Sequence, residues 1–343
     1  MLIRTILLFL ILLWCCSCGV QHQEFHFNGS TMGTIYNVKI ISDKLAIRTL
    51  DQIKRGIDSV LISINQQMST YMYNSEISAF NNHESTEQFP VSSGFAMVVD
   101  RALFWSSQTG GAFDITLVPL LYLWGFGPGQ DKLILDDFPD TQTVLNRLTH
   151  VGFNKISVAE NVITKSDPFV KLDLNSIAKG HGVDAVFAYI ESRNIDNMMV
   201  EIGGEVRTKG TNRKNKPWII AVERPQVSSL NKKEVDWVVE LENSAMATSG
   251  NYRNFFEIDD EIYSHIIDPR SGYPTKTGIA SATVIASYCM DADALATALM
   301  VLTVEDGLQL IESLNTVEAC LIIHDGKGDY ILKKSSGMQI AEL

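Results

Sequence analysis

The segment 291–297, Asp-Ala-Asp-Ala-Leu-Ala-Thr, holds two side chains whose spacing suits a metal ion. If the segment is helical, Asp293 and Thr297 lie four residues apart and share one face of the helix, about one turn from each other. The alanines and the leucine between them favour a helix and leave room for a ligand. A carboxylate and a hydroxyl without Cys or His are hard oxygen ligands, which suit Mg²⁺ better than zinc. The segment therefore indicates a magnesium site serving a phosphate, with a plain helix cap by Asp291 or Asp293 as the alternative.

A second polar segment, residues 171–180, places an acid beside a cation. A strand is predicted to end at Leu174 and a helix to begin near Ser176, so free backbone N–H groups lie next to Asp173. Lys179 falls in the first turn of that helix, where the helix dipole favours anions rather than cations. This position indicates that Lys179 binds a phosphate of a ligand. The alternative is that Asp173 caps the helix and Lys179 is solvated.

Residues 265–272, His-Ile-Ile-Asp-Pro-Arg-Ser-Gly, place a histidine in a strand that ends in an Asp-Pro turn. Such a histidine is a candidate general base, because its ordinary pKa lies near neutrality. Glycine-led turns at 110–114 and 203–205 permit close backbone approach to a ligand. The aromatic and glycine loop 124–129 is placed to cover a planar ring or, alternatively, to fill the core.

The elements that must position these residues alternate between helix and strand patterns. Apolar residues at helical spacing and glycine stop signals predict helices over 46–67, 94–109, 176–193 and 291–301. Alternating or apolar runs predict strands at 25–27, 35–40, 155–158, 169–174, 198–202, 218–223 and 235–241, and a late hairpin pairs 321–323 with 330–332. The mixture predicts an α+β fold, a single domain of largely antiparallel sheet with packed helices.

The beginning of the chain has the composition of an export signal. Arg4 is followed by an apolar run, and Ser17 and Gly19 flank Cys18. This pattern resembles a bacterial lipoprotein signal, with an ordinary secretory leader as the alternative. We therefore expect residues 1–17 to be a signal peptide, Cys18 to carry the lipid, 18–24 to be a tether and 25–343 to be the folded domain. The protein would be exported and anchored by lipid to a bacterial membrane, facing the periplasm.

Charge and cysteine content narrow the classes of function further. A net charge of −12 argues against a nucleic-acid partner, because phosphate backbones attract basic surfaces. Beyond the first eighteen residues the only cysteines are Cys289 and Cys320. In an exported protein these two either form a disulfide or remain buried thiols.

Seven segments, taken together and in order, resemble the ApbE family of flavin transferases. They are 29–36, 68–71 with 75–77, 110–114 with 124–127, 173–180, 203–205, 265–272 and 291–297. The resemblance runs from about residue 29 to about residue 301, nearly the whole exported body. Enzymes of this family move FMN from FAD onto a threonine or serine of a protein.

The resemblance implies roles for individual residues. It implies contacts with FAD for Met32, Tyr71, Ala112, Phe113, Asp114, Asp173, Lys179 and Ile267. It implies that Mg²⁺ is bound by Asp293, Thr297 and an oxygen of Ser176. The chain departs from the family pattern at Ser176 and His181, where relatives often carry Ala and Tyr. Coordination through the carbonyl of residue 176 would make the first change harmless.

The expected function is Mg²⁺-dependent transfer of FMN from FAD to a hydroxyl of an acceptor protein, with release of AMP. A hydroxyl is a weak nucleophile, so a base is needed; His265 is the first candidate and Asp291 the second. The alternatives are hydrolysis of FAD to FMN and AMP, and a lipoprotein that binds flavin without turning it over. By analogy with the family, the acceptor would belong to a membrane redox complex exposed in the same compartment.

Overall fold

The computed structural model describes residues 23–43, 45–127, 138–223, 235–251, 255–258, 261–325 and 329–342. The predicted leader, Cys18 and most of the tether lie outside these residues. The helices are α2 (Ile47–Met68), α3 (Glu76–Asn82), α4 (Ser93–Gln108), α5 (Val118–Leu123), α6 (Thr141–Leu148), α7 (Asn175–Glu191), α8 (Cys289–Val301) and α9 (Val304–Ser313), with a 3₁₀ turn η1 (Phe153–Lys155).

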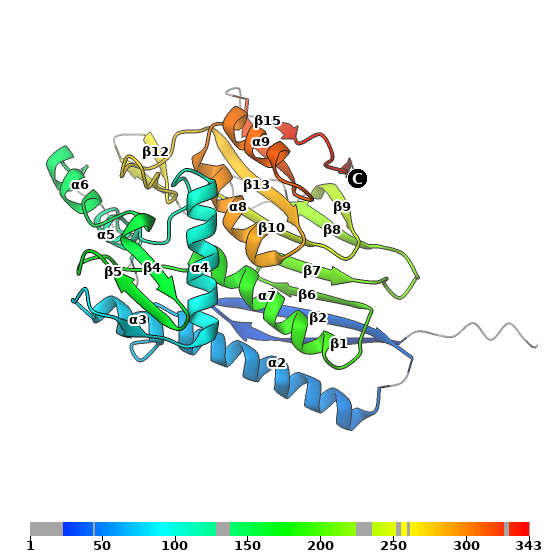
Figure 1. Cartoon of the computed structure of the whole chain (residues 1–343). Coiled ribbons are helices and arrows are strands. Elements are labelled where there is room, and N and C mark those ends of the chain that lie inside the picture. The colour runs from blue at the N-terminus through cyan, green and yellow to red at the C-terminus, as the bar shows by residue number, and fades with distance from the viewer. Residues whose placement is uncertain are drawn as a thin grey trace, which may run out of the picture.

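An eight-stranded antiparallel sheet runs through the body of the molecule (Figure 1). In spatial order its strands are β1 (Gln23–Thr31), β2 (Thr34–Ser42), β6 (Met198–Ile202), β7 (Glu205–Lys209), β10 (Ala245–Gly250), β13 (Ile279–Ala286), β14 (Glu318–His324) and β15 (Tyr330–Lys334). Smaller antiparallel sheets join β3 (Phe89–Pro90), β5 (Val162–Lys165) and β4 (Ile156–Ala159); β16 (Ala341–Glu342), β9 (Val235–Leu241) and β8 (Trp218–Glu223); and β11 (Phe255–Ile258) with β12 (Glu261–Ser264).

The two faces of the large sheet pack against different layers. Because successive strand residues point to opposite faces, Leu321 of β14 packs on the helix side, whereas Cys320 and Ile322 pack on the other side. Helices α2, α4, α7 and α8 supply the helix side, and β8 and β9 cover the opposite face with Trp218 and Val239. The large sheet is therefore covered on both faces, with separate hydrophobic cores on its two sides.

Helix α8 lies at the centre of the helix layer, and all of its residues except Thr297 are buried. Its alanines allow the neighbouring helix to approach closely. A Cβ placed on Gly180 of α7 would lie 2.4 Å from the carbonyl oxygen of Cys289, so only glycine fits at this crossing. The sequence of both helices therefore sets their separation, and with it the position of Asp293 relative to α7.

The four predicted helices are confirmed as α2, α4, α7 and α8, each within two residues of its expected ends. The α+β class, the antiparallel sheet and the late hairpin of β14 and β15 are also confirmed.

The strand predicted over 169–174 is wrong. Its alternation is real, since Val170, Leu172 and Leu174 are buried, but this backbone joins no sheet. The side chain of Asn81 instead bonds both the N–H and the carbonyl of Leu172. Likewise, His265 follows β12 rather than lying within it.

In the described part of the chain, no helix has the length and apolar character needed to cross a membrane. Cys289 and Cys320 are both buried free thiols, one in α8 and one in β14. Burial raises the pKa of the Cys320 thiol to about 12. The pair therefore takes the thiol alternative, and neither cysteine is a nucleophile at neutral pH.

Candidate functional site

A cavity of about 760 Å³ opens where the ends of several elements meet, which is the size range of a cofactor pocket. Its walls come from the start of β2, the 112–114 turn, α5, the start of α7, the β6–β7 turn, β10, the 265–267 segment and α8. The predicted site residues that line it are Ala112, Phe113, Asp114, Asp173, Ser176, Lys179, His265, Ile267, Asp293 and Thr297. Segments that lie far apart in the sequence and carry predicted site residues therefore meet at one cavity.

Asp293 and Thr297 lie on the one face of α8 that reaches the cavity. The Oδ2 atom of Asp293 accepts the backbone N–H of Gly180 over 2.9 Å. One turn later, the Thr297 hydroxyl lies 3.3 Å from that of Ser249 on β10. The predicted pairing of a carboxylate and a hydroxyl on one helix face is therefore present, and Ser249 extends it.

Lys179 lies between two acids. Its Nζ is 3.1 Å from Oε1 of Glu205 and 3.7 Å from Oδ1 of Asp293. Burial of the ammonium lowers the Lys179 pKa, but the charges of Asp293 and Glu205 outweigh burial, so the pKa is raised and the lysine stays charged. Burial and the charge of Asp293 raise the pKa of Glu205, whereas the ammonium of Lys179, 3.1 Å away, opposes this rise and favours the charged carboxylate.

Asp114 braces the turn that forms one wall. It accepts hydrogen bonds from the backbone N–H of Thr116 at 2.8 Å, from the Thr116 hydroxyl at 2.6 Å and from the N–H of Phe153 at 2.7 Å. Burial raises its pKa in spite of these bonds. Its carboxylate therefore fixes the shape of the wall that carries Ala112 and Phe113.

Asp173 sits at the start of α7, where it accepts the N–H of Asn175 at 2.7 Å. The N-cap of the helix is Leu174, which makes no side-chain cap. Asp173 thus bonds a free helix N–H, as the capping alternative expected, and it also lines the cavity. The other half of that alternative is wrong, because Lys179 is paired with Glu205 rather than solvated.

His265 lines the cavity, just after the end of β12. Its ring meets the ring of Phe126 edge-on, with centroids 6.2 Å apart. Trp124, from the same aromatic loop, is buried and donates its indole N–H to the carbonyl of Gly272 over 2.8 Å. The loop thus both fills the core with Trp124 and lines the cavity with Phe126; residues 128 and 129 of the loop lie outside the described residues.

Three predicted residues do not line the cavity. The side chain of Met32 packs against α7, where a Cβ added to Gly182 would lie 3.7 Å from the Met32 Sδ. Tyr71 follows the end of α2 and is 74% exposed. Asp291 points away to α4, where Arg101 binds it with two N–H groups and Trp105 donates its indole N–H over 2.7 Å. Of the two candidate bases, only His265 therefore faces the cavity.

The structure also brings in residues that the sequence did not single out as site residues. Glu205 is 3% exposed, and its Oε2 has no hydrogen-bond partner in the described part of the chain. The sequence feature that could have indicated Glu205 is the Gly203-Gly204 turn before it, which places the first residue of β7 at the cavity. Ser249 had no signal, because a strand of small residues resembles any packed strand.

The donor set at α8 fits a magnesium ion. Among the described residues, no three side chains of His, Cys, Asp or Glu gather as they do in a zinc or multi-carboxylate calcium site. The cavity instead offers oxygens of Asp293, Thr297 and Ser176, which belong to hard ligand classes. Magnesium commonly keeps waters and uses few protein ligands, so a site with one carboxylate is ordinary for it.

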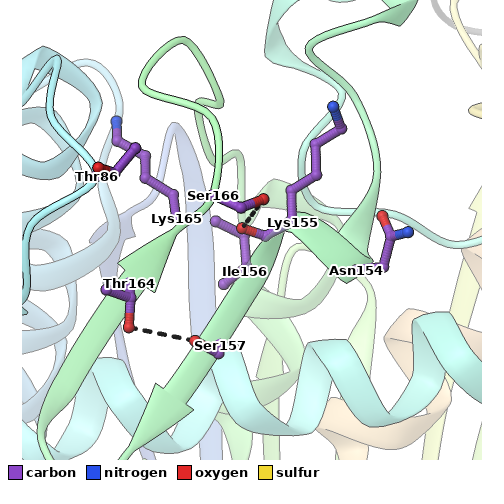
Figure 2. A pocket seen from close by; sticks show the side chains of 8 residues that line it. All are labelled: Thr86, Asn154, Lys155, Ile156, Ser157, Thr164, Lys165 and Ser166. Atoms are coloured by element: carbon purple, nitrogen blue, oxygen red, sulfur yellow. Dashed lines mark hydrogen bonds between the residues drawn. The ribbon is translucent and has the colours of Figure 1, made fainter.

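A second, shallower hollow of about 480 Å³ lies on the β4–β5 hairpin. Figure 2 shows Lys155 and Lys165 extending to opposite sides of it, with Ser157 and Thr164 bonded across the hairpin at 3.2 Å. The Lys165 ammonium donates to the carbonyl of Val170 over 3.1 Å, which supports the 169–174 segment. None of the predicted site residues lines this hollow.

The chain is similar to known proteins over most of its length. The model of the ApbE family matches residues 32–321. The FAD:protein FMN transferase of Vibrio cholerae serotype O1 is 41% identical over 317 residues, 92% of each chain. That of Haemophilus influenzae is 38% identical over 328 residues, which cover 94% of this chain and 93% of the relative.

Solved structures agree in fold. The flavin transferase ApbE from Vibrio cholerae has a TM-score of 0.81 at 40% identity, covering 92% of this chain and 98% of that one. The apo form of the Pseudomonas stutzeri flavinyl transferase ApbE has a TM-score of 0.81 at 33% identity, covering 92% and 96%. With its matched residues spanning most of the described body, this chain belongs to the ApbE family.

Proposed function

We propose that this protein transfers FMN from FAD to a threonine or serine hydroxyl of an acceptor protein and releases AMP. The observation that carries the proposal is one wall of the cavity, where Asp293, Thr297 and Lys179 meet. An oxygen-donor set beside a fixed ammonium suits a pyrophosphate, because its transfer chemistry depends on positioning and on neutralising charge.

In this reaction the acceptor oxygen forms a bond to the FMN-side phosphorus, and the bond from that phosphorus to the oxygen of AMP breaks. Magnesium held by Asp293, Thr297 and an oxygen of Ser176 would neutralise the pyrophosphate charge. Lys179 adds a second positive charge at the same wall. His265 takes the proton of the acceptor hydroxyl, since it is the candidate base that lines the cavity.

Most of the residues predicted for flavin contact line the cavity. Phe113 and Ile267 are buried lining residues. Ala112, which packs with Val301, and Asp173, which lies just before α7, line the same cavity. These residues enclose the ring and nucleotide parts of FAD in the proposal, and the acceptor enters from the open side.

The test uses the purified full-length protein with FAD, Mg²⁺ and a threonine-bearing acceptor segment, followed by mass spectrometry of the acceptor. We expect the mass of an FMN phosphodiester on the acceptor, release of AMP, and loss of both on addition of EDTA. Free FMN and AMP with an unmodified acceptor would instead identify a hydrolase. FAD that binds but remains intact would identify a flavin-binding protein.

We further propose that the protein is exported and held at a bacterial membrane by lipid on Cys18, facing the periplasm. The support is the leader pattern around Cys18. The acceptor would then be a subunit of a membrane redox complex in the same compartment. In fractionated cells, Cys18→Ala should move the protein from the membrane to the soluble fraction, and unchanged retention would contradict the lipid anchor.

A further inference from the structure

The two carboxylates beside Lys179 are not equivalent. Lys179 lies within hydrogen-bond distance of Glu205, at 3.1 Å, but 3.7 Å from Oδ1 of Asp293, which is too long for a hydrogen bond. The other oxygen of Asp293 is occupied by the N–H of Gly180. The ammonium is thus drawn to Glu205, and Oδ1 of Asp293 receives no hydrogen bond from it.

Lys179 is the most exposed of the three charged side chains at this wall. Its side chain is 29% exposed, compared with 4% for Glu205 and 3% for Asp293, and all three residues line the cavity. An ammonium and a divalent cation are both attracted to a carboxylate, so a lysine paired with Asp293 would compete with a cation for it.

The buried position of Glu205 lowers the stability of the folded protein. It is the first residue of β7, it follows a turn in which Gly203 and Gly204 have φ of +64° and +111°, and its Oε2 is buried without a partner among the described residues. Burying a carboxylate oxygen with no hydrogen bond destabilises the folded protein, because the hydration that the oxygen loses is not replaced. A residue kept at such a cost, and aimed at a ligand cavity, points to a role in binding or catalysis.

We propose that Glu205 is a positioning residue that holds the ammonium of Lys179 away from Asp293. In this arrangement Oδ1 of Asp293 stays open to the divalent cation, and Lys179 stays directed at the pyrophosphate. Without the negative charge of Glu205, the ammonium moves onto Asp293, pairs with it and blocks the cation. The inference rests on the proposed function, because it assigns a metal ion to Asp293.

The test is a double-mutant cycle read by Mg²⁺ binding in isothermal titration calorimetry, on the full-length protein without FAD. Glu205→Gln keeps the size of the side chain, and we expect it to weaken Mg²⁺ binding about tenfold. In the Lys179→Met background no ammonium is left to move, so the same substitution should change Mg²⁺ affinity less than about threefold.

An equal loss in both backgrounds would overturn the inference, because Glu205 would then act on the cation directly. Unchanged affinity in Glu205→Gln would overturn it as well. Thermal unfolding of each variant separates these outcomes from misfolding. If Glu205→Gln does not fold, Glu205→Asp keeps the charge but withdraws the acceptor by one methylene, and it should weaken Mg²⁺ binding only when Lys179 is present.

The wild-type protein separates this inference from the proposed function. If wild type transfers FMN and binds Mg²⁺ but the cycle shows no coupling, only the role of Glu205 is wrong. If wild type binds no Mg²⁺, the metal assignment at Asp293 is wrong, and the role of Glu205 with it.

Discussion

The backbone N–H of Gly180 donates to Oδ2 of Asp293 over 2.9 Å and joins the start of α7 to α8 at the wall of the cavity. The same glycine lets the two helices touch, because its Cβ position is filled by backbone atoms of Cys289 and Met290. One residue thus sets both the distance between the helices and the orientation of the carboxylate. Packing and chemistry are therefore coupled at this crossing.

Gly180→Ala should weaken the packing of α7 on α8 and disturb the orientation of the Asp293 carboxylate. The added methyl would lie 2.4 Å from the carbonyl oxygen of Cys289 and 2.7 Å from the Cα of Met290, and backbone atoms cannot turn aside. We expect a loss of roughly 1–3 kcal/mol in the free energy of unfolding, together with reduced FMN transfer. Denaturant unfolding and the transfer assay measure the two effects.

Gly307→Ala on α9 is the matched control for that substitution. Its new methyl meets the end of the Leu299 side chain at 2.9 Å, which can rotate away. Transfer should be unchanged there. Equal effects at the two glycines would contradict the role given to the α7–α8 crossing.

Asp293→Asn should abolish Mg²⁺-dependent transfer while the protein stays folded. The amide oxygen can still accept the N–H of Gly180, so the tie between the helices survives, but the negative charge is lost. We expect at least a hundredfold loss of rate by the mass-spectrometric assay, with a far-UV circular dichroism spectrum like that of wild type. The exposed Asp51→Asn on α2 is the control, and wild-type turnover in Asp293→Asn would rule out the metal assignment.

His265→Asn and Asp291→Asn should separate the two candidate bases. Because His265 lines the cavity, its loss should lower the transfer rate by about 10²–10⁴-fold with little change in thermal stability. Asp291 is held by Arg101 and Trp105, so its change should cost roughly 1–2 kcal/mol of stability and leave transfer measurable while the protein is folded.

The reverse pattern would make Asp291 the base. Both variants are therefore assayed at a temperature where their circular dichroism spectra match that of wild type. FAD binding, followed by flavin fluorescence, should be retained in each.

His181 should make the stability of the protein depend on pH. Burial lowers the pKa of this residue in α7 to about 4, below the unfolded value of 6.5. Between these two values the unfolded chain binds the proton more readily than the folded chain, so stability falls as the pH falls. The contribution is fully present above pH 6.5 and amounts to roughly 3 kcal/mol at most.

Urea unfolding of wild type and His181→Phe at several pH values measures this contribution. The variant cannot be protonated at this position, so its stability should decline less than that of wild type between pH 6.5 and pH 4. Parallel profiles for the two proteins would show that His181 is not the group responsible.

Local pattern was sufficient for much of the fold. The amphipathic spacing of α2 and the glycine pair after α4 predicted both helices closely, because these signals act within a few turns. The 169–174 segment shows the limit. Its alternation predicts a strand, but a strand also needs a partner, and here Asn81 from α3 takes the hydrogen bonds at Leu172.

The site residues also fall into those that local sequence predicted and those that only the folded structure placed. The sequence by itself determined that Asp293 and Thr297 share a helix face and that Lys179 sits near a helix start, since both follow from spacing along one helix. Only the tertiary structure decided that Glu205 holds Lys179, that Asp291 turns to Arg101 and that Tyr71 stays at the surface. These outcomes depend on which distant strands and helices meet, and the large sheet and the α7–α8 crossing settle that only when the whole chain has folded.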